Sequence, residues 1–457
     1  MLRLKDPQLT IWDFILPAEL LELKEELARV DALLDDDSFL APFIARFDTR
    51  IGRPTVPVET YLRLMYLKFR YQLGYEVLVE EVKDSIKWRR FCRIHLDGRV
   101  PHSTTLIKLT RRYGSEIIDT LNDALITKAR DQKVIRGRKL RLDTTVLEAD
   151  IHYPTDASLL SDGIRVITRT VKGIKEAGAA VLTKFQDRSR SVKKCILSLT
   201  KVLRRRTGEA YTEVRQITGE ILKTAQQVVV EAGQVAKNAR QYLYRQGNNP
   251  PKRVQFMTQA LDRAIKLTEQ VINQTIAVQQ GNVRLPERMV SIFAPEARPI
   301  KRGKLHASTE FGHKVLLQET EERVVTGYRV LDGNPGDDSL LVDAVDQHLA
   351  TFGRPPWAVA TDRGFGSKAN EIALKERGVK RCSLPLKGKL TKSRQEHQSR
   401  SWFKRLQRWR AGGEATISLL KRKYGLKRSL FRGVSGARAW VGLGILTYNL
   451  RRIATLM

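Results

Sequence analysis

Apolar positions recur at helical spacing through the first part of the chain. Between Val56 and about Gly114 they repeat every three or four residues, in two stretches that Gly74 separates. This spacing is typical of the buried face of an amphipathic helix. Ser103 can cap a third helix in the same region. The pattern therefore predicts an all-helical N-terminal domain over residues 1–130.

The periodicity changes from helix to strand near residue 139. Apolar residues alternate with polar ones over Lys139–Val146, and β-branched residues cluster there, which predicts a strand. Strand signals resume near Arg298 and alternate with helical patterns at 338–350 and 367–378. Because strands and helices alternate in this way in βαβ units, we expect an α/β fold in this part of the chain.

A long helical stretch separates the two strand-rich regions. Residues from about 160 to 295 are polar and basic, with a break at Asn248-Asn249-Pro250-Pro251, where the residue types favour a turn. So much helix between strands predicts an insertion within one domain. The α/β domain would then span 131–457 and be interrupted by this helical insertion.

The charge of the chain points to a polyanionic partner. It has 82 Lys and Arg against 50 Asp and Glu, a formal net charge of +32. Nucleic acid is the leading candidate, because neutralising phosphates releases counterions and supplies most non-specific affinity. The cations on the N-terminal helices are compatible with a helix-turn-helix-like DNA reader. An ordinary helical bundle with a solvated basic face explains them equally well.

Cysteine usage and hydropathy indicate a reducing compartment. Cys92, Cys195 and Cys382 lie far apart and form neither a disulfide framework nor a CxxC pair. The N-terminus lacks a signal-peptide pattern, and no apolar run reaches the ~18–20 residues needed to span a bilayer. We expect a cytoplasmic, nucleoid-associated protein without a membrane partner.

Two aspartates mark the predicted sheet. Asp143 lies in the first predicted strand, and Asp362 ends another, in Thr361-Asp362-Arg363-Gly364-Phe365. Acids on adjacent strands can share hard cations such as Mg²⁺ or Mn²⁺. Two such ions, roughly 3.5–4 Å apart, activate an attacking oxygen and stabilise a leaving one. Taken singly, each aspartate is explained as well by a turn or a helix cap.

A third acid stands in the basic C-terminal tail. Residues 377–457 contain 21 Lys or Arg and only two acids, Glu396 and Glu414. Glu414 follows Gly412-Gly413 and is expected to open a helix, where the helix dipole alone would favour it. Glu371 and Glu376 compete for the same role, although a solvated helix face accounts for them adequately.

The tail resembles a signature of bacterial insertion-sequence transposases with a DDE site. Arg410, Glu414 and Lys421 have the spacing of the last three residues in its Tyr-Arg-Glu-Lys motif, and Gln407 stands where Tyr is expected. The sequences around Asp143 and Asp362 resemble those of the family's first and second acids. Gly52-Arg53-Pro54 and the helices after it resemble the family's N-terminal domain.

The resemblance implies an RNase H-like fold, a mixed sheet flanked by helices, and a metal-dependent DNA transposase. Asp143 and Asp362 would bridge two Mg²⁺ or Mn²⁺ ions, and Glu414 would complete the second site. Arg410 and Lys421 would grip phosphates. Gln407 could donate a hydrogen bond in place of the missing Tyr, and Arg363 is a further DNA-binding candidate.

The partner would be double-stranded DNA, both the element's ends and the target. The family also implies a homodimer that brings two ends together. Two other functions stay open: a non-catalytic DNA-binding protein derived from a transposase, and a nuclease of the same fold. Nuclease and transposase differ in strand transfer, which the residues themselves do not reveal.

Overall fold

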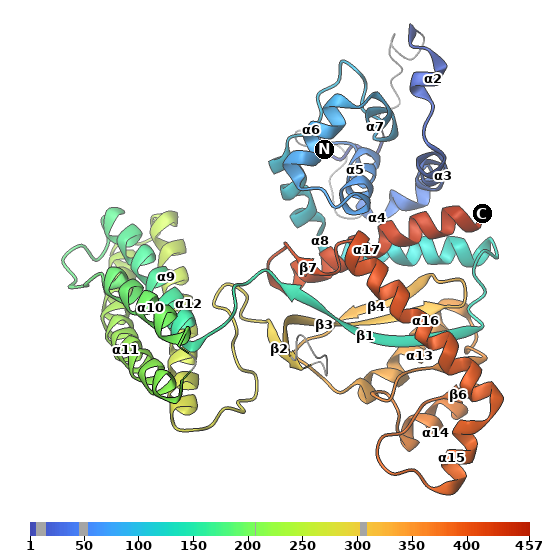
Figure 1. Cartoon of the computed structure of the whole chain (residues 1–457). Coiled ribbons are helices and arrows are strands. Elements are labelled where there is room, and N and C mark those ends of the chain that lie inside the picture. The colour runs from blue at the N-terminus through green and yellow to red at the C-terminus, as the bar shows by residue number, and fades with distance from the viewer. Residues whose placement is uncertain (6–14, 45–53, 206, 302–308) are drawn as a thin grey trace. The chain divides into compact units, whose positions relative to one another are not determined.

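The computed structural model describes residues 1–5, 15–44, 54–205, 207–301 and 309–457 (Figure 1). The chain folds as two compact units, one of Met1–Ala149 with Gly312–Met457 and one of Asp150–Phe311. The predicted helical segment 1–130 thus shares a compact unit with the sheet, and its boundary as a separate domain stays a prediction. Gly52 and Arg53 lie outside the described residues.

The N-terminal region is helical, as the periodicity predicts. Its helices are α2 (Ala18–Leu21), α3 (Glu25–Leu34), α4 (Ala41–Ile44), α5 (Val58–Arg70), α6 (Tyr75–Asp84), α7 (Ile86–Phe91) and α8 (Ser103–Asp131). Gly74 is the N-cap of α6. The cap of α8 is one residue earlier than expected, because the ring of His102, not the hydroxyl of Ser103, accepts a hydrogen bond from the Thr104 amide at 3.2 Å.

The sheet confirms the predicted α/β character. Its strands in the first unit are β1 (Lys139–Ala149), β3 (Thr309–Thr320, which begins in the other unit), β4 (Val325–Val330), β5 (Ala358–Ala360), β6 (Arg381–Ser383) and β7 (Arg428–Ser429). The order is β3-β1-β5-β6, with β4 beside β3 and β7 beside β1. Because β1 is antiparallel to β3 and parallel to β5, the sheet is mixed.

Helices cover both faces of the sheet (Figure 1). On one face, α13 (Leu341–Phe352) and α14 (Lys368–Glu376) share an apolar cluster with Leu140 and Leu142 of β1. On the other face, Leu406 of α16 (Ser401–Lys423) packs against Ala358 and Ala360 of β5. The short helix α15 (Lys392–Ser399) precedes α16. Leu140 and Leu142 of β1 and the alanines of β5 are thereby buried on opposite faces of the sheet, because side chains alternate between the faces along a strand.

The last helix, α17 (Gly433–Leu456), joins the helical region to the sheet. It packs against α3, α5, α8 and β4. The fully buried Asn449 accepts a hydrogen bond from the Val325 amide at 3.0 Å and donates one to the Val325 carbonyl at 2.7 Å. These bonds satisfy a polar group that would otherwise be costly inside the core. The N-terminal helices and the sheet are therefore packed as one body.

The second unit has a core of its own. It contains α9 (Asp156–Glu176), α10 (Ser189–Leu203), α11 (Gly208–Arg245), α12 (Lys252–Gln279) and the strand β2 (Arg298–Lys301). The apolar cluster of this unit includes Ile164, Val228 and Leu261. The predicted break at Asn248–Pro251 is confirmed, since it forms the turn between α11 and α12.

Two further expectations can be compared with the described residues. All three cysteines are free, in agreement with the prediction that no disulfide framework exists. Among the helices that the structure describes, none combines the length and apolar character required to cross a bilayer.

Candidate active site

Asp143 lies in the interior of β1, where it pairs with Leu317 of β3. Its Oδ1 accepts a hydrogen bond from the Thr144 amide at 2.8 Å. Only 21% of the side chain is exposed. Since side chains alternate along a strand, Asp143 faces the same side as Arg141, the side on which α16 packs.

Asp362 lies two residues beyond the end of β5 and belongs to the turn that follows. Its Oδ1 accepts a hydrogen bond from the Gly364 amide at 2.8 Å. The last paired residues of β1 and β5 are Arg141 and Ala360. Continued by two residues, this parallel register brings Asp143 level with Asp362. Asp143 and Asp362 therefore each lie two residues beyond the last pair of these neighbouring strands.

Glu414 lies in the middle of a continuous helix, which corrects the expectation that it opens one. Helix α16 begins at Ser401 and runs through Gly412 and Gly413 without a break. A Cβ atom at Gly412 would lie 3.2 Å from Nη1 of Arg141, and one at Gly413 would lie 3.2 Å from its Nε. The glycine pair therefore allows close approach of α16 to the sheet.

A buried ion pair fixes α16 on the sheet. Arg141 donates to Glu319 through Nε at 2.9 Å and through Nη2 at 2.5 Å, and its Nη1 donates to the Trp409 carbonyl at 2.7 Å. Thr416 of α16 also donates to Glu319, at 2.8 Å. Burial raises the pKa of Glu319 despite these donors. These contacts, which the sequence analysis missed, set which face of α16 is turned toward β1.

Arg410 links two of the predicted carboxylates. Its Nη1 lies 3.7 Å from Oδ2 of Asp143, and its Nη2 donates to Oε1 of Glu414 at 3.1 Å. Arg410 is largely buried, whereas the side chain of Glu414 is 67% exposed. Lys421 lies seven residues after Glu414 in the same helix, a spacing that places both on one face. Of the three signature residues on α16, Arg410 contacts Asp143, Glu414 contacts Arg410, and Lys421 shares the helix face of Glu414.

Gln407 binds the ends of two strands. Its Nε2 donates to the carbonyls of Thr361 and Ser383 at 3.2 and 2.8 Å and to the Ser383 hydroxyl at 2.9 Å. Through these bonds, the residue that stands in place of the expected Tyr holds α16 beside Asp362. A contact between Gln407 and DNA stays a prediction.

An open hollow of about 580 Å³ adjoins Asp362. Its charged lining is one carboxylate, that of Asp362, and four cations, Arg363, Lys404, Arg408 and Arg410. Cations grouped around a hollow suit the phosphates of a nucleic acid. Of the predicted DNA-binding residues, Arg363, Gln407 and Arg410 meet in this hollow.

A further acid, Asp337, lies near Asp362 and was not anticipated. A Cβ atom built on Gly364 would lie 2.5 Å from Oδ2 of Asp337 and 2.9 Å from Oδ1 of Asp362. Asp337 also pairs with Lys314 at 2.7 Å. In the sequence, Asp337 directly follows a stretch of turn-forming residues. Its local sequence therefore did not distinguish it from an ordinary turn aspartate.

The acids that competed with Glu414 lie in other environments. Glu371 forms two hydrogen bonds with Arg394, at 2.6 and 2.8 Å, and is thereby held in an ion pair. Glu376 is exposed on α14. Neither acid shares the link through Arg410 that Glu414 has to Asp143.

The donor set fits a hard divalent cation only in part. Asp143 and Asp362 offer carboxylate oxygens, the ligand type that Mg²⁺ and Mn²⁺ prefer. Among the residues that the structure describes, no group of three or more His, Cys, Asp or Glu side chains is placed to hold a metal ion. Glu414 is paired with Arg410 and would have to turn toward the aspartates to join them.

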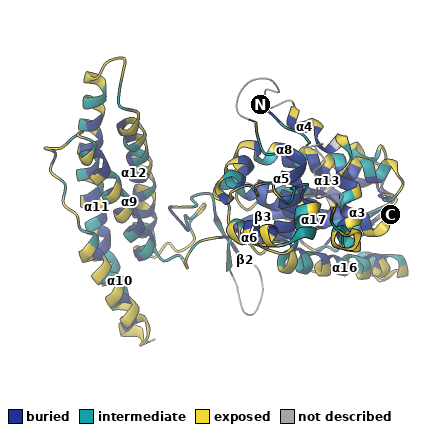
Figure 2. Cartoon of the chain, turned by 90° about the horizontal axis from the view of Figure 1, so that it is seen from above, coloured by how far each residue is buried: buried dark blue, intermediate teal, exposed yellow. Residues whose placement is uncertain are grey.

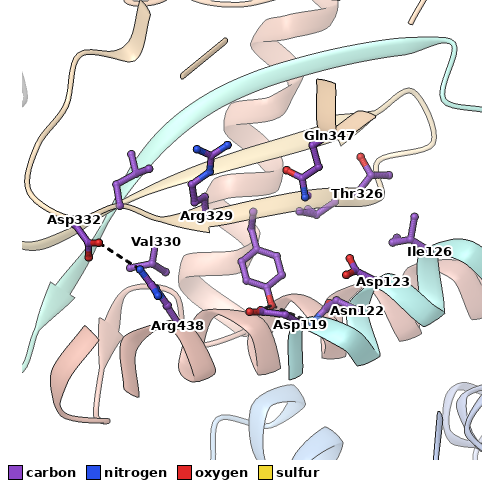
Figure 3. Close-up of a pocket in the computed structure, with 14 residues that line it drawn as sticks. Asp119, Asn122, Asp123, Ile126, Thr326, Arg329, Val330, Asp332, Gln347 and Arg438 are labelled. Carbon is purple, nitrogen blue, oxygen red and sulfur yellow. Dashed lines mark hydrogen bonds and ion pairs between the residues drawn. The ribbon is translucent and has the colours of Figure 1, made fainter. Parts of the chain in front are cut away.

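A second cavity, of about 360 Å³, lies between α8, β4 and α17 and contains none of the predicted site residues (Figure 3). Asp119 accepts a hydrogen bond from the Tyr328 hydroxyl, and Arg438 pairs with Asp332 at 3.4 Å. Burial raises the pKa of Asp119. Because acids and arginines both line this cavity and partly pair with one another, it presents no uniform charge to a ligand.

Two parts of the chain match known protein families. Residues 17–112 match the family described as "Transposase domain (DUF772)", and residues 294–450 match the "Transposase DDE domain". An uncharacterized protein of Rhizobium meliloti, ORF8 in the nfe locus, is 26% identical over 161 residues, which are 32% of this chain and 78% of that protein. No solved structure matches the chain.

Proposed function

We propose that this chain, which belongs to the DDE transposases of insertion sequences, cuts the ends of its element and joins them to target DNA with the help of divalent metal ions. The proposal depends mainly on one observation: Arg410 lies 3.7 Å from Asp143 and donates to Glu414, and it lines one hollow together with Asp362. The mixed sheet with helices on both faces supports an RNase H-like catalytic domain.

The three acids are the candidate metal ligands. Asp143 and Asp362 would hold Mg²⁺ or Mn²⁺ between them, and Glu414 would complete a second site. When bound, two such ions supply activation of the attacking oxygen and stabilisation of the leaving oxygen. In their absence, the Arg410 guanidinium compensates the negative charge of Asp143 and Glu414.

Cations of α16 and the Asp362 turn would hold the DNA. Arg363, Lys404, Arg408 and Arg410 line the hollow beside Asp362, and Lys421 shares a helix face with Glu414. A phosphate that binds Arg410 draws the guanidinium away from the two carboxylates, because a bidentate phosphate contact competes for the same donors. The carboxylates then become available to a cation.

Two phosphates would be attacked in turn, one at the end of the element and one in the target, and neither attack requires a covalent bond to the protein. In the first step, water attacks and releases a 3′-OH; in the second, that 3′-OH attacks a phosphate of the target. The partner is double-stranded DNA, and joining two ends would require at least a homodimer. The site of action would be the nucleoid in the cytoplasm.

The test is a cleavage and strand-transfer assay with Mg²⁺ on DNA that carries the inverted repeats flanking the gene. Asp143→Asn, Asp362→Asn and Glu414→Gln should each abolish both steps and leave DNA binding intact. Glu376→Gln, which changes an exposed acid on α14, is the matched control and should retain full activity. Cleavage without strand transfer would favour a nuclease. Binding without either reaction in the unaltered protein would favour a non-catalytic DNA-binding protein.

A further inference from the structure

Two highly exposed aromatic side chains lie on either side of the turn between α11 and α12. Tyr244, near the end of α11, is 89% exposed, and Phe256, in the first turns of α12, is 72% exposed. Neither belongs to the apolar core of its unit. Residues 240–256, which contain both, are called the insertion tip below. Figure 2 shows exposed positions in yellow along the helices of this unit.

The insertion tip is also strongly basic. Between Glu231 and Asp262 the sequence has no acid, and its five cations are Lys237, Arg240, Arg245, Lys252 and Arg253. Four of these, Arg240, Arg245, Lys252 and Arg253, are exposed residues of the tip. Within the part of the chain that the structure describes, Arg240 forms an ion pair with Asp262 at 3.7 Å, and the other three cations form none.

The loop between α9 and α10 extends this surface. Its Thr183 hydroxyl accepts a hydrogen bond from Asn238 of α11 at 2.8 Å, so the loop lies beside the part of α11 that directly precedes the insertion tip. The loop exposes Leu182 completely, and Lys184 is exposed next to it. Apolar and cationic side chains are therefore interleaved over neighbouring parts of the unit.

Exposed aromatic rings among unpaired cations are the side chains that bind single-stranded nucleic acid. The cations attract the backbone phosphates, and the rings stack on the faces of unpaired bases. In an intact duplex the faces of the bases are covered by neighbouring base pairs, so aromatic rings of the protein cannot stack on them. Contiguous exposed apolar side chains also mark interaction sites in general.

We propose that the insertion tip binds unpaired DNA bases, such as those at an opened or cut end of the element. This inference rests on the proposed function for its choice of DNA as the partner. A second copy of this chain fits less well, because two such tips brought together would oppose like charges.

The test measures binding by the full chain in the absence of divalent metal, so that no chemistry occurs. The probes are a fluorescently labelled thymidine oligonucleotide and a blunt duplex of the same length. Tyr244→Ala combined with Phe256→Ala should weaken single-strand binding by roughly tenfold or more and leave duplex binding within about twofold. Tyr211→Ala, which removes an exposed ring from the other end of α11, is the control and should change neither affinity.

The contribution of charge is tested separately. Arg245→Gln, Lys252→Gln and Arg253→Gln together should weaken single-strand binding and reduce its dependence on salt, since fewer counterions are released. Lys223→Gln, an exposed cation in the middle of α11, is the control. Circular dichroism should show unchanged helix content in each variant, because every substituted side chain is exposed.

Three outcomes separate this inference from its alternatives. Unchanged single-strand affinity in the aromatic variant would overturn it. A changed sedimentation coefficient with unchanged single-strand affinity would also overturn it and would identify a second copy as the partner. Failure of the proposed catalytic function would appear differently, as undiminished cleavage by Asp143→Asn, and would leave the single-strand measurement unaffected.

Discussion

The guanidinium of Arg410 lies 3.7 Å from the carboxylate of Asp143, although the two residues come from a helix and a strand far apart in the sequence. The same guanidinium contacts Glu414 at 3.1 Å. Because a cation between two carboxylates offsets their repulsion, Arg410 can hold both acids in place before DNA and metal bind. We therefore expect Arg410 to have two partners in turn, the carboxylates and a phosphate.

Replacing Arg410 should impair cleavage strongly. Arg410→Ala would remove the proposed phosphate contact and should lower the rate with Mg²⁺ by about 10²–10³-fold, on the scale of losing one positioned donor. Arg410→Lys should recover only part of this loss, because an ammonium group cannot form the bidentate contact. Initial cleavage rates at saturating DNA measure the effect.

The control for Arg410 is Arg422→Gln, which removes an exposed cation from the end of the same helix. It should keep the cleavage rate within about threefold, since surface changes of this kind are usually small. Equal losses in Arg410→Ala and Arg422→Gln would mean that the helix contributes only general positive charge.

The glycine pair of α16 gives a second prediction. Gly413→Val should lower both stability and cleavage, because even a Cβ atom there would lie 3.2 Å from Nε of Arg141, whose side chain is held by Glu319 and Trp409. A displaced α16 would carry Arg410 and Glu414 away from Asp143. Thermal unfolding and cleavage rates measured on the same preparation test this.

A different glycine supplies the comparison. A Cβ atom at Gly233, inside α11, would meet nothing within 4 Å. Gly233→Ala should therefore raise the free energy of unfolding by about 1 kcal/mol, the usual difference between these residues in a helix, and leave cleavage unchanged. If Gly413→Val were as well tolerated, close packing of α16 on Arg141 would not matter to the site.

Much of the site could be predicted from sequence, and the failures have identifiable causes. The alternation around Asp143 and the spacing of Arg410 and Glu414 are local patterns, and both are found in the expected elements. The continuity of α16 was not predicted, because glycine has a low helix propensity and a pair of glycines suggests a break. In the structure, the close packing of Gly412 and Gly413 on Arg141 requires residues without a side chain inside the helix. Local propensity cannot report a contact with a distant strand.

Side-chain contacts that depend on the register of the strands could not be predicted from the sequence either. Arg141 meets Glu319 because β1 and β3 pair in one particular register, and nothing in either segment states that register. Asp337 was missed for a related reason, since its approach to Asp362 arises only once the sheet has formed. The parallel pairing of β1 with β5, by contrast, joins the two strands that the sequence had already marked with the predicted acids Asp143 and Asp362.

The Arg141–Glu319 pair gives a third prediction, on stability. Glu319→Ala should lower the free energy of unfolding by about 3–5 kcal/mol, because it leaves a buried guanidinium without its counter-charge. The double variant Arg141→Met with Glu319→Leu should recover most of the stability, since neither charge is then buried. Denaturant unfolding measures both.

Cleavage should not recover with stability in that double variant. Arg141 also donates to the Trp409 carbonyl, and Glu319 accepts from Thr416; both contacts to α16 are lost. Full cleavage by the double variant would show that the ion pair stabilises the fold without positioning α16.

Acid stability should depend on Glu26. Burial by itself raises the pKa of Glu26, but hydrogen bonds from Arg70 and Arg451 outweigh it and hold the pKa at about 2. A lowered pKa adds stability that is present above the ordinary value of 4.5 and is lost as the pH falls toward 2. Glu26→Gln should therefore cost about 2 kcal/mol at pH 7, an estimate reduced for partial exposure.

The pH dependence is the sharper part of this prediction. The difference in the free energy of unfolding between Glu26→Gln and the unaltered protein should shrink steadily from pH 5 to pH 2. Glu25→Gln, which changes a more exposed acid in the same helix, should show little difference at any pH. A constant difference across this range would mean that Glu26 acts through packing and not through its charge.

Exchanging the oxygen donors of Asp143 and Asp362 for sulfur tests whether these side chains are ligands of catalytic metal ions. The measurement is the rate of DNA cleavage by Asp143→Cys and Asp362→Cys, first with Mg²⁺ and then with the more thiophilic Mn²⁺. Each variant should lose about 10³-fold or more with Mg²⁺ and regain a substantial part with Mn²⁺, whereas the corresponding Asn variants should not recover. Full activity of either Cys variant with Mg²⁺ would contradict this role.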